Sequence, residues 1–216
     1  MDDVELFAQM RERLFPAVVG DVLDTMGLRH QYLPPHIQPL DPSMAILGRA
    51  MPVLEEDHDG SGPPFGLMFR ALDDLRPQEV YVAAAGTPPY ALWGELMSTR
   101  ARHLGAAGAV LDGYARDTAG IVALGFPTFA AGRYAQDQAP RGRVVDFRAT
   151  VQIGGVHIRP GDLVFGDLDG VLVIPQEAER EAIAQALEKV TTEDQVRAAM
   201  EAGMGAAEAF QKFGAM

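Results

Sequence analysis

The spacing of hydrophobic positions changes several times along the first third of the chain, and each spacing predicts a different element. Apolar side chains recur every three to four positions in the two N-terminal segments, the second starting at Pro16, a residue suited to a first helical turn. The run LPPHIQPLDP cannot be helical, because each proline restricts the residue before it. The predicted elements are helices over 3–14, 16–26 and 65–75, a strand over 44–54, an extended segment over 33–42 and a polar loop over 55–64.

Strand and helix patterns alternate in the middle of the chain. They predict strands over 79–86 and 109–112 and helices over 93–103 and 117–124. This alternation indicates parallel strands joined by crossover helices, so the two strands should run side by side. From Phe126 onward, short apolar runs separated by Gly, Pro and Asp favour antiparallel pairing.

The length and the absence of a linker indicate one domain. The 216 residues are enough for one sizeable core, and no Ser/Gly/Pro-rich stretch divides them into halves. We predict a single α/β domain over 1–216 with a mixed sheet. Its parts are N-terminal helices within 3–27, a core over 44–175 and a tail over 176–213, expected to be two charged helices separated near Thr191 and Thr192.

Charge and composition exclude several classes of protein. The net charge is −12, from 30 acidic and 18 basic residues, so the chain offers no basic face for nucleic acid. No apolar run approaches the length of a bilayer span, and the N-terminus is acidic, unlike a signal peptide. Cysteine is absent, which rules out disulfides, thiolate metal sites and a cysteine nucleophile. We expect a cytoplasmic protein without membrane or nucleic-acid partners.

Most common catalytic groups are also missing. The two lysines, Lys189 and Lys212, lie in the helical tail, where neither suits Schiff-base chemistry. No Gly-Lys pair makes a P-loop, and no serine lies in a G-x-S-x-G motif. The five histidines lack the spacing of a zinc site. Carboxylates, arginine and a hard metal ion remain as candidate chemistry.

Such groups occur together in the stretch WGELMSTRARHLGAAGAVLDGYARD, residues 93–117. If a helix begins near Gly94, the free amides of its first turn form an anion site that a ligand can approach closely over the glycine. Arg116 and Asp117 follow the next strand, whose carboxyl end should meet the same sheet edge. Arginine can clamp a carboxylate, and Asp117 with Glu95 could hold a hydrated divalent cation. Spacing alone equally allows a helix-dipole carboxylate and a surface ion pair.

Three other features each allow two interpretations. The stretch EEDHDG (55–60) could be a second carboxylate cluster that reaches the site or a solvated loop. GDLDG (166–170) resembles part of a calcium loop but is better explained as a hairpin turn closed by Asp-Gly. Tyr90 and Trp93 could line a ligand channel or pack in the core.

The order WGEL…GAAGAVLDGYARD followed by GRVVDFRATVQIGGVHIRPGDLVFGDLDGVLVIP resembles the RraA-like family, which includes metal-dependent 4-hydroxy-4-methyl-2-oxoglutarate (HMG/CHA) aldolases. GDVLDTMGLRHQYLPPHIQPL (20–40) also resembles the family's N-terminal segment, so the resemblance covers most of the chain. It implies an α/β/β/α sandwich with a central mixed sheet. Family aldolases have Asp where Glu95 stands and Gly where Ala91 stands, whereas the family's ribonuclease regulators lack an acid at the position of Asp117.

The resemblance implies a role for each matching residue. Catalysis would rest on Glu95, Arg116 and Asp117, with Asp117 as the ligand of Mg²⁺ or Mn²⁺. The backbone of four consecutive residues would bind the carboxylate of a small 2-oxo acid together with Arg116. These four are Gly94, Glu95, Leu96 and Met97.

The implied activity is that of a carbon–carbon lyase. The chain would be a class II aldolase that cleaves 4-hydroxy-2-oxo acids to pyruvate and decarboxylates oxaloacetate through the same enolate. The alternative is a non-enzymatic regulator of ribonuclease activity that acts by protein–protein binding. A methyltransferase, a third name attached to the family, finds no glycine-rich cofactor loop here. The resemblance also implies a homotrimer or homohexamer, with which the amphipathic tail 198–213 is compatible.

Overall fold

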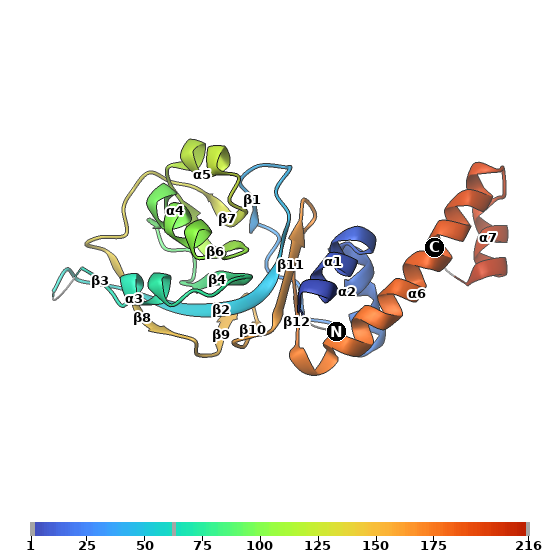
Figure 1. Cartoon of the computed structure of the whole chain (residues 1–216), viewed down its shortest axis with the longest axis horizontal. Coiled ribbons are helices and arrows are strands. Elements are labelled where there is room, and N and C mark those ends of the chain that lie inside the picture. The colour runs from blue at the N-terminus through green and yellow to red at the C-terminus, as the bar shows by residue number, and fades with distance from the viewer. Residues whose placement is uncertain (1–2, 62–63, 215–216) are drawn as a thin grey trace. The chain divides into compact units, whose positions relative to one another are not determined.

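The computed structural model describes residues 3–61 and 64–214, and its contacts divide the chain into two compact units. One unit combines the residues up to Arg29 with those from Glu177 onward, and the other is His30–Gln176 (Figure 1). The predicted domain 1–216 and the predicted loop 55–64 both include residues outside the described ranges. The single-domain boundary therefore stays a prediction.

The first unit is helical. Its four helices are α1 (Asp3–Arg13), α2 (Pro16–Thr25), α6 (Gln176–Glu201) and α7 (Ala206–Phe213), and the first two confirm the predicted helices 3–14 and 16–26. Lys189 on α6 forms ion pairs with Asp21 on α2 at 3.2 Å and with Glu193 at 2.9 Å, as expected of a helix-surface lysine. No helix in the described ranges is long and apolar enough to cross a membrane.

The predicted break in the tail is at the wrong place. Helix α6 continues through Thr191 and Thr192, whose hydroxyls donate to the carbonyls of Leu187 at 2.9 Å and Glu188 at 3.2 Å. Threonine can make this bond to the preceding turn and so remain helical. The helix ends at Glu201, just before Gly203, which has a φ of +99° that favours glycine.

The second unit is built on a mixed sheet, as predicted. Its main path has the strand order β1 (Gln38–Pro39), β7 (Thr128–Arg133), β6 (Gly108–Ala115), β4 (Glu79–Ala84), β2 (Ile46–Asp57), β11 (Leu163–Asp167) and β12 (Gly170–Ile174). Three strands branch from it: β3 (Phe65–Gly66), β5 (Ala91–Trp93) and β8 (Gly142–Phe147). A separate hairpin joins β9 (Val151–Ile153) to β10 (Val156–Ile158). The α/β class is therefore confirmed.

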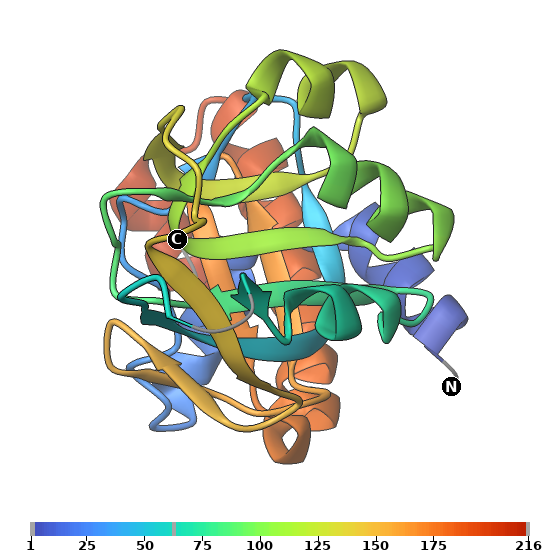
Figure 2. The same cartoon turned by 90° about the vertical axis from the view of Figure 1, so that its left-hand side faces the viewer.

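The parallel strands position the later site. β2, β4, β6 and β7 follow one another in sequence and in the sheet, all parallel, which confirms the predicted pairing of the strands near 79–86 and 109–112. Their connections carry α3 (Met68–Asp73), α4 (Glu95–His103) and α5 (Thr118–Leu124). Crossovers of one hand that advance in one direction place their helices on the same face of the sheet, and these three lie together in Figures 1 and 2.

Three sequence predictions need correction. β7 is parallel to β6, not antiparallel, because α5 crosses over between them. β2 extends to Asp57 where a loop was predicted, because β8 pairs with its last residues and Glu55 is buried. The helix predicted over 65–75 is shorter, since Phe65 and Gly66 pair with β8 instead. In contrast, GDLDG is the predicted hairpin turn, between β11 and β12.

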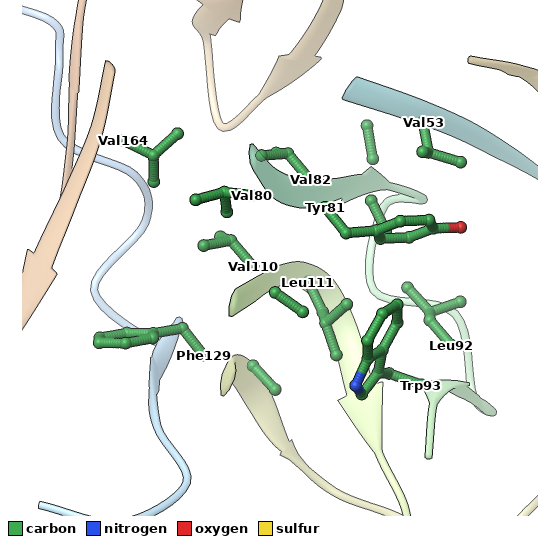
Figure 3. Close-up of a cluster of buried hydrophobic side chains, with 14 of the residues drawn as sticks. Val53, Val80, Tyr81, Val82, Leu92, Trp93, Val110, Leu111, Phe129 and Val164 are labelled. Atoms are coloured by element: carbon green, nitrogen blue, oxygen red, sulfur yellow. The ribbon is translucent and has the colours of Figure 1, made fainter. Parts of the chain in front are cut away.

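Valine, leucine and aromatic side chains from the parallel strands form the core (Figure 3). Trp93 is 1% exposed and packs between Tyr81, with ring centroids 4.8 Å apart, and Phe126, whose ring it stacks at 6.1 Å. Tyr90 is also buried, and its hydroxyl donates to Asp57 at 3.0 Å. Both aromatic residues thus belong to the core, and Trp93 anchors the chain immediately before α4.

Candidate active site

The start of α4 presents free backbone amides. Gly94 is its N-cap in extended conformation, and no side chain of the described residues caps it. The first intrahelical bond runs from the amide of Ser98 to the carbonyl of Gly94 at 3.1 Å, so the amides of the intervening residues lack an acceptor within the helix. Trp93 fixes this turn, because its indole donates to the Ser98 hydroxyl at 2.7 Å. The buried core therefore holds in place a helix end of the kind that can bind anions.

The end of β6 lies against this turn. Ala115 pairs with Trp93 in parallel register, and the amide of Arg116 donates to the Trp93 carbonyl at 2.9 Å. A Cβ atom on Gly94 would lie 2.9 Å from Oδ2 of Asp117, so only glycine allows this approach without displacing the carboxylate. The two segments predicted to meet at the sheet edge do meet.

Asp117 has an unusual backbone conformation. Its φ of +56° and ψ of +33° are left-handed, a region that aspartate tolerates better than most residues. The turn lets α5 begin at Thr118 immediately after the strand and leaves the Asp117 side chain 53% exposed. Backbone strain of this kind is concentrated at ligand sites, which makes Asp117 a candidate for function.

Arg116 lies between two carboxylates. Its Nε atom is 3.7 Å from Oδ2 of Asp117, and its Nη2 atom is 3.5 Å from Oδ1 of Asp137. All three side chains are between 36% and 53% exposed, so they face solvent and can exchange these partners for a ligand. The three side chains form a cation flanked by two anions. Arg116 can bind an anionic ligand while a carboxylate beside it binds a metal ion.

These groups share a cavity of about 240 Å³. Its lining includes five of the six residues predicted for the site: Gly94, Leu96, Met97, Arg116 and Asp117. The other described lining residues are Phe65, Met68, Phe69, Ala91, Leu92, Trp93, Asp137 and Gln138. Five of the predicted residues thus lie around one cavity, two of them (Arg116 and Asp117) among its polar side chains, and their functional roles stay a prediction.

Glu95 is the sixth predicted residue, and its side chain does not line this cavity. Its carboxylate accepts a hydrogen bond from the Thr99 hydroxyl at 2.9 Å, one turn along α4. Its stem lies against Gly120 of α5, where an added Cβ would be only 2.6 Å from Cγ of Glu95. The Glu95 side chain therefore lies against α5 and outside the lining of the cavity.

Sequence reasoning missed Asp137 and Gln138. The loop that contains them returns beside β5, where Asp137 bridges to Ala91 and the Gln136 carbonyl accepts from the Ala91 amide at 2.8 Å. Gln138 is buried and donates from its side-chain amide to the carboxylate of Glu55. No local sequence pattern predicts that this loop lies beside β5, because its position depends on pairing between residues far apart in the chain.

Glu55 is a buried acidic group that contacts Gln138 in the cavity lining. It is 4% exposed, and burial raises its pKa from 4.5 to about 8, against the opposing effect of the hydrogen bond from Gln138. The stretch 55–60 therefore contributes one buried carboxyl beneath the polar edge of the cavity. In the described part of the chain, no three acidic or histidine side chains are grouped as a metal cluster.

The residues fit a hydrated magnesium-type ion better than a fully protein-ligated one. Asp117 offers one half-exposed carboxylate beside the cavity, and Asp137 a second on the far side of Arg116. Mg²⁺ is commonly bound by one or two carboxylates together with waters and ligand oxygens. A zinc site would need nitrogen or sulfur ligands, and none of the described cavity residues is histidine or cysteine.

The chain matches a known protein family. A family model described as RraA-like (Aldolase/RraA) matches residues 17–173, which include all the cavity residues. The chain belongs to the RraA-like family.

Individual relatives are similar over most of the chain. Protein DlpA of Legionella pneumophila is 29% identical over 188 residues, 87% of this chain but 30% of that protein. A Halalkalibacterium halodurans protein named "Putative 4-hydroxy-4-methyl-2-oxoglutarate aldolase" is 33% identical over 83% of this chain and 80% of its own length. The structure of Streptomyces coelicolor RraAS2, described as an unusual member of the RNase ES inhibitor RraA protein family, has a TM-score of 0.83 at 26% identity, covering 91% of this chain and 98% of that one.

Proposed function

We propose that this RraA-like protein is a divalent-metal-dependent class II aldolase that cleaves 4-hydroxy-2-oxo acids to pyruvate, with oxaloacetate decarboxylase activity. The main support for this proposal is that the free amides of α4, Arg116 and Asp117 lie at one cavity. The aldolase name of the Halalkalibacterium relative supports the reaction class. The physiological substrate would be a small 2-oxo acid.

The helix end binds the carboxylate of the 2-oxo acid. The amides of Glu95, Leu96 and Met97 point out of the first turn of α4, and Gly94 lets the ligand approach the backbone. Arg116 donates from the other side to the carboxylate or keto oxygen. With the carboxylate bound by the α4 amides and Arg116, the keto carbon lies beside Asp117.

Asp117 would hold Mg²⁺ or Mn²⁺. The metal ion supplies Lewis acidity at the keto oxygen when it is bound. Arg116 meets the negative charge that develops on the same oxygen as the C3–C4 bond breaks and its electrons form the pyruvate enolate. The 4-hydroxyl loses its proton as C4 becomes a carbonyl, and a proton is returned to C3 of the enolate.

Two carboxyl groups, Glu95 and Asp137, are the candidates for moving these protons. Glu95 is predicted to act through a water, which agrees with its bond from Thr99 and its place outside the cavity lining. Asp137 lines the cavity directly. Glu95→Gln and Asp137→Asn distinguish the two, because the proton-transfer group is the one whose amide variant loses turnover and retains pyruvate binding.

Metal-dependent pyruvate formation tests the function. With oxaloacetate as substrate, we expect turnover with Mg²⁺ that EDTA abolishes, and a loss of more than about 100-fold in Asp117→Ala because a metal ligand is removed. Isothermal titration with Mg²⁺ should lose its signal in the same variant. The matched control is Asp169→Ala in the exposed turn between β11 and β12, which should behave like the wild type. Full activity of Asp117→Ala with Mg²⁺ present would contradict the assignment.

The second candidate function is a non-enzymatic regulator of ribonuclease activity that acts by protein–protein binding. The likeness to RraAS2 favours it, since that protein is described as belonging to the RNase ES inhibitor family. A regulator should give no metal-dependent pyruvate from any 2-oxo acid. The homotrimer or homohexamer implied by the resemblance stays a prediction, which light scattering on the purified protein tests.

A further inference from the structure

One wall of the cavity is apolar and partly exposed. Met68 and Phe69 on α3, Phe65 just before that helix, and Leu96 and Met97 on α4 all line the cavity. Phe69 is 58% exposed and Leu96 is 80% exposed, whereas side chains of this kind are usually covered. We call these five residues the apolar wall. It adjoins the α4 amides, because Leu96 and Met97 contribute both side chains to the wall and two amides to the first turn.

The charges around the cavity do not favour a second anionic group on the ligand. Among the described lining residues Arg116 is the one cation, and it is already flanked by Asp117 and Asp137. The proposed 2-oxo acid uses Arg116 for its own carboxylate or keto oxygen. A further carboxylate would therefore lie against apolar side chains with no cation to pair with, at a cost in desolvation.

A second hollow beside the site does contain another cation, Arg133. This hollow has a volume of about 330 Å³ and shares Arg116 and Asp117 with the first. Arg133 already donates from Nη2 to the carbonyl of Leu40 at 2.6 Å. The α4 amides line the first cavity and not this one, so a ligand anchored on them extends along the apolar wall.

From this geometry we infer the class of substrate, an inference that rests on the proposed function. The preferred substrates are 4-hydroxy-2-oxo acids with one carboxylate and an aryl or branched alkyl group on C4. Cleavage then releases pyruvate and an apolar aldehyde or ketone. Contact with the wall distinguishes these substrates from analogues with a carboxylate on C4, by at least about tenfold in kcat/KM, since even one methylene changes selectivity by that much in an apolar pocket.

A matched pair of substrates tests the inference. Pyruvate release is measured for 4-hydroxy-2-oxo-4-phenylbutanoate and 4-hydroxy-2-oxoglutarate, which differ in the group on C4. We expect kcat/KM for the phenyl compound to be at least about tenfold higher. The uncleaved analogues 2-oxo-4-phenylbutanoate and 2-oxoglutarate, which carry the same two groups on C4, should show the same order as competitive inhibitors. Equal values, or a preference for the carboxylate compounds, would overturn the inference.

A charge introduced into the wall should change the preference. Phe69→Arg places a cation where the C4 group is expected, so the phenyl-to-carboxylate ratio of kcat/KM should fall by about 100-fold. Val122→Arg on the exposed face of α5 is the matched control, because Val122 is outside the described cavity lining, and it should keep the wild-type ratio. If Phe69→Arg leaves the ratio unchanged but alters the oligomeric mass, the wall is a contact between copies and the inference is wrong.

Oxaloacetate separates this inference from the function on which it rests. Its second carboxylate is attached to C3, too close to the keto group to reach the wall. Its decarboxylation therefore depends on the α4 amides, Arg116 and Asp117 and not on the wall. Metal-dependent turnover of oxaloacetate without a phenyl preference refutes the inference and keeps the proposed function. No pyruvate from any of these substrates refutes both.

Discussion

The site depends at the residue scale on how closely Gly94 and Asp117 approach. The missing side chain of Gly94 leaves room for the carboxylate, and an added Cβ would be 2.9 Å from Oδ2 of Asp117. The backbone of Gly94 is extended, at a φ of −151°, which alanine adopts without strain. Gly94→Ala therefore tests how closely the Asp117 carboxylate approaches this position, without adding backbone strain.

We expect Gly94→Ala to displace Asp117 and lower kcat/KM for oxaloacetate by about 10²-fold, because misplacement of a catalytic group by about 1 Å has an effect of that size. The thermal midpoint should stay close to that of the wild type. Gly205→Ala is the control, since Gly205 has a φ of −70° and open space around it. Unchanged turnover in Gly94→Ala would mean that Asp117 need not hold its observed position.

Residue positions were predicted from the sequence more reliably than side-chain directions. Arg116 and Asp117 were identified because adjacent charges directly follow a buried strand, and strand order then fixes their place. The direction of Glu95 could not be predicted, because it depends on the space left by Gly120 and on the bond to Thr99. The place of Asp137 depends on its loop returning to β5.

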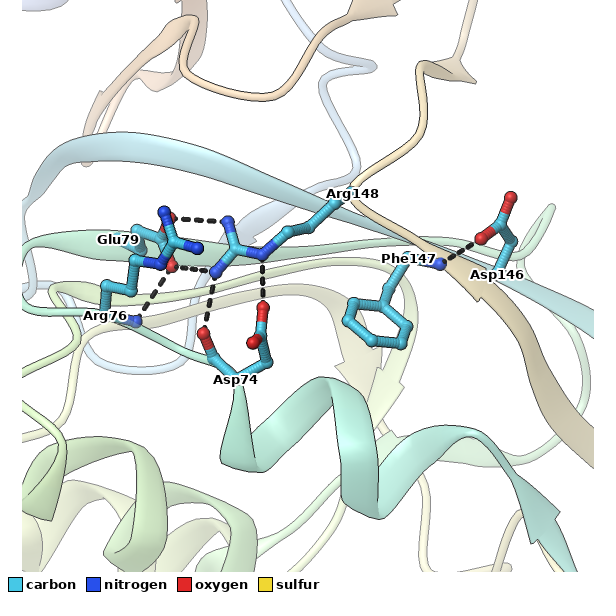
Figure 4. Close-up of polar contacts among 6 residues, drawn as sticks. All are labelled: Asp74, Arg76, Glu79, Asp146, Phe147 and Arg148. Carbon is cyan, nitrogen blue, oxygen red and sulfur yellow. Dashed lines mark hydrogen bonds and ion pairs between the residues drawn. The ribbon is translucent and has the colours of Figure 1, made fainter.

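At the scale of elements, Arg148 ties three segments together (Figure 4). It follows β8, and its guanidinium donates to the carboxylate and carbonyl of Asp74 after α3 and to both carboxylate oxygens of Glu79 at the start of β4. The Arg148 hydrogen bond and charge hold the pKa of Asp74 below its usual value, although the Asp74 side chain is 44% exposed. This contact fixes α3, and with it one side of the apolar wall.

Removal of this link should destabilise the unit His30–Gln176. We expect Arg148→Ala to lower the free energy of unfolding by about 2 kcal/mol, and Arg148→Lys by about half as much, because lysine keeps the charge but not the planar fork. Urea unfolding followed by the fluorescence of Trp93, the one tryptophan, measures the change in this unit. Arg100→Ala breaks a more exposed pair with Asp73 and should cost less than about 1 kcal/mol. Equal losses in the two alanine variants would contradict this account.

Most element types followed from local patterns, but strand pairing followed only where a crossover helix determined it. The βαβ alternation correctly predicted the parallel pairing of β4 with β6, because a crossover helix leaves little choice. The apolar run of β7 has no local feature that distinguishes parallel from antiparallel pairing, and that prediction was wrong. The break assigned to Thr191 and Thr192 was wrong for a similar reason, since threonine can bond to the preceding turn and Gly203 is the actual breaker.

At the scale of the whole molecule, a net charge of −12 makes buried carboxyl groups costly. Glu55 and Tyr81 are both buried, and Oε1 of Glu55 and the Tyr81 hydroxyl have no hydrogen-bond partner among the described residues. Burial, and then the nearby Glu55 charge, raises the pKa of Tyr81 well above its usual value. Ionised Glu55 would thus add a poorly compensated charge to the core, and its proton is part of what keeps the fold stable.

The stability of the unit His30–Gln176 should therefore fall as pH rises. The unfolded chain releases the Glu55 proton near pH 4.5, whereas the folded chain keeps it until about pH 8. Between these values the folded state binds one more proton, so the free energy of unfolding decreases with increasing pH and levels off above pH 8. Glu55→Gln removes this dependence while its amide oxygen can still accept from Gln138. The variant should match the wild type near pH 4.5 and exceed it by roughly 3–5 kcal/mol near pH 9.

Urea midpoints from Trp93 fluorescence at pH 4.5, 6.5 and 9 measure this difference, because Trp93 lies in the core of the same unit. Glu56→Gln is the control, because this substitution removes the same formal charge at a neighbouring residue that is exposed. It should shift the midpoint by a small and nearly constant amount at all three pH values. If Glu55→Gln and Glu56→Gln show parallel pH profiles, Glu55 is ionised in the folded protein, and solvent or a neighbouring group compensates its charge.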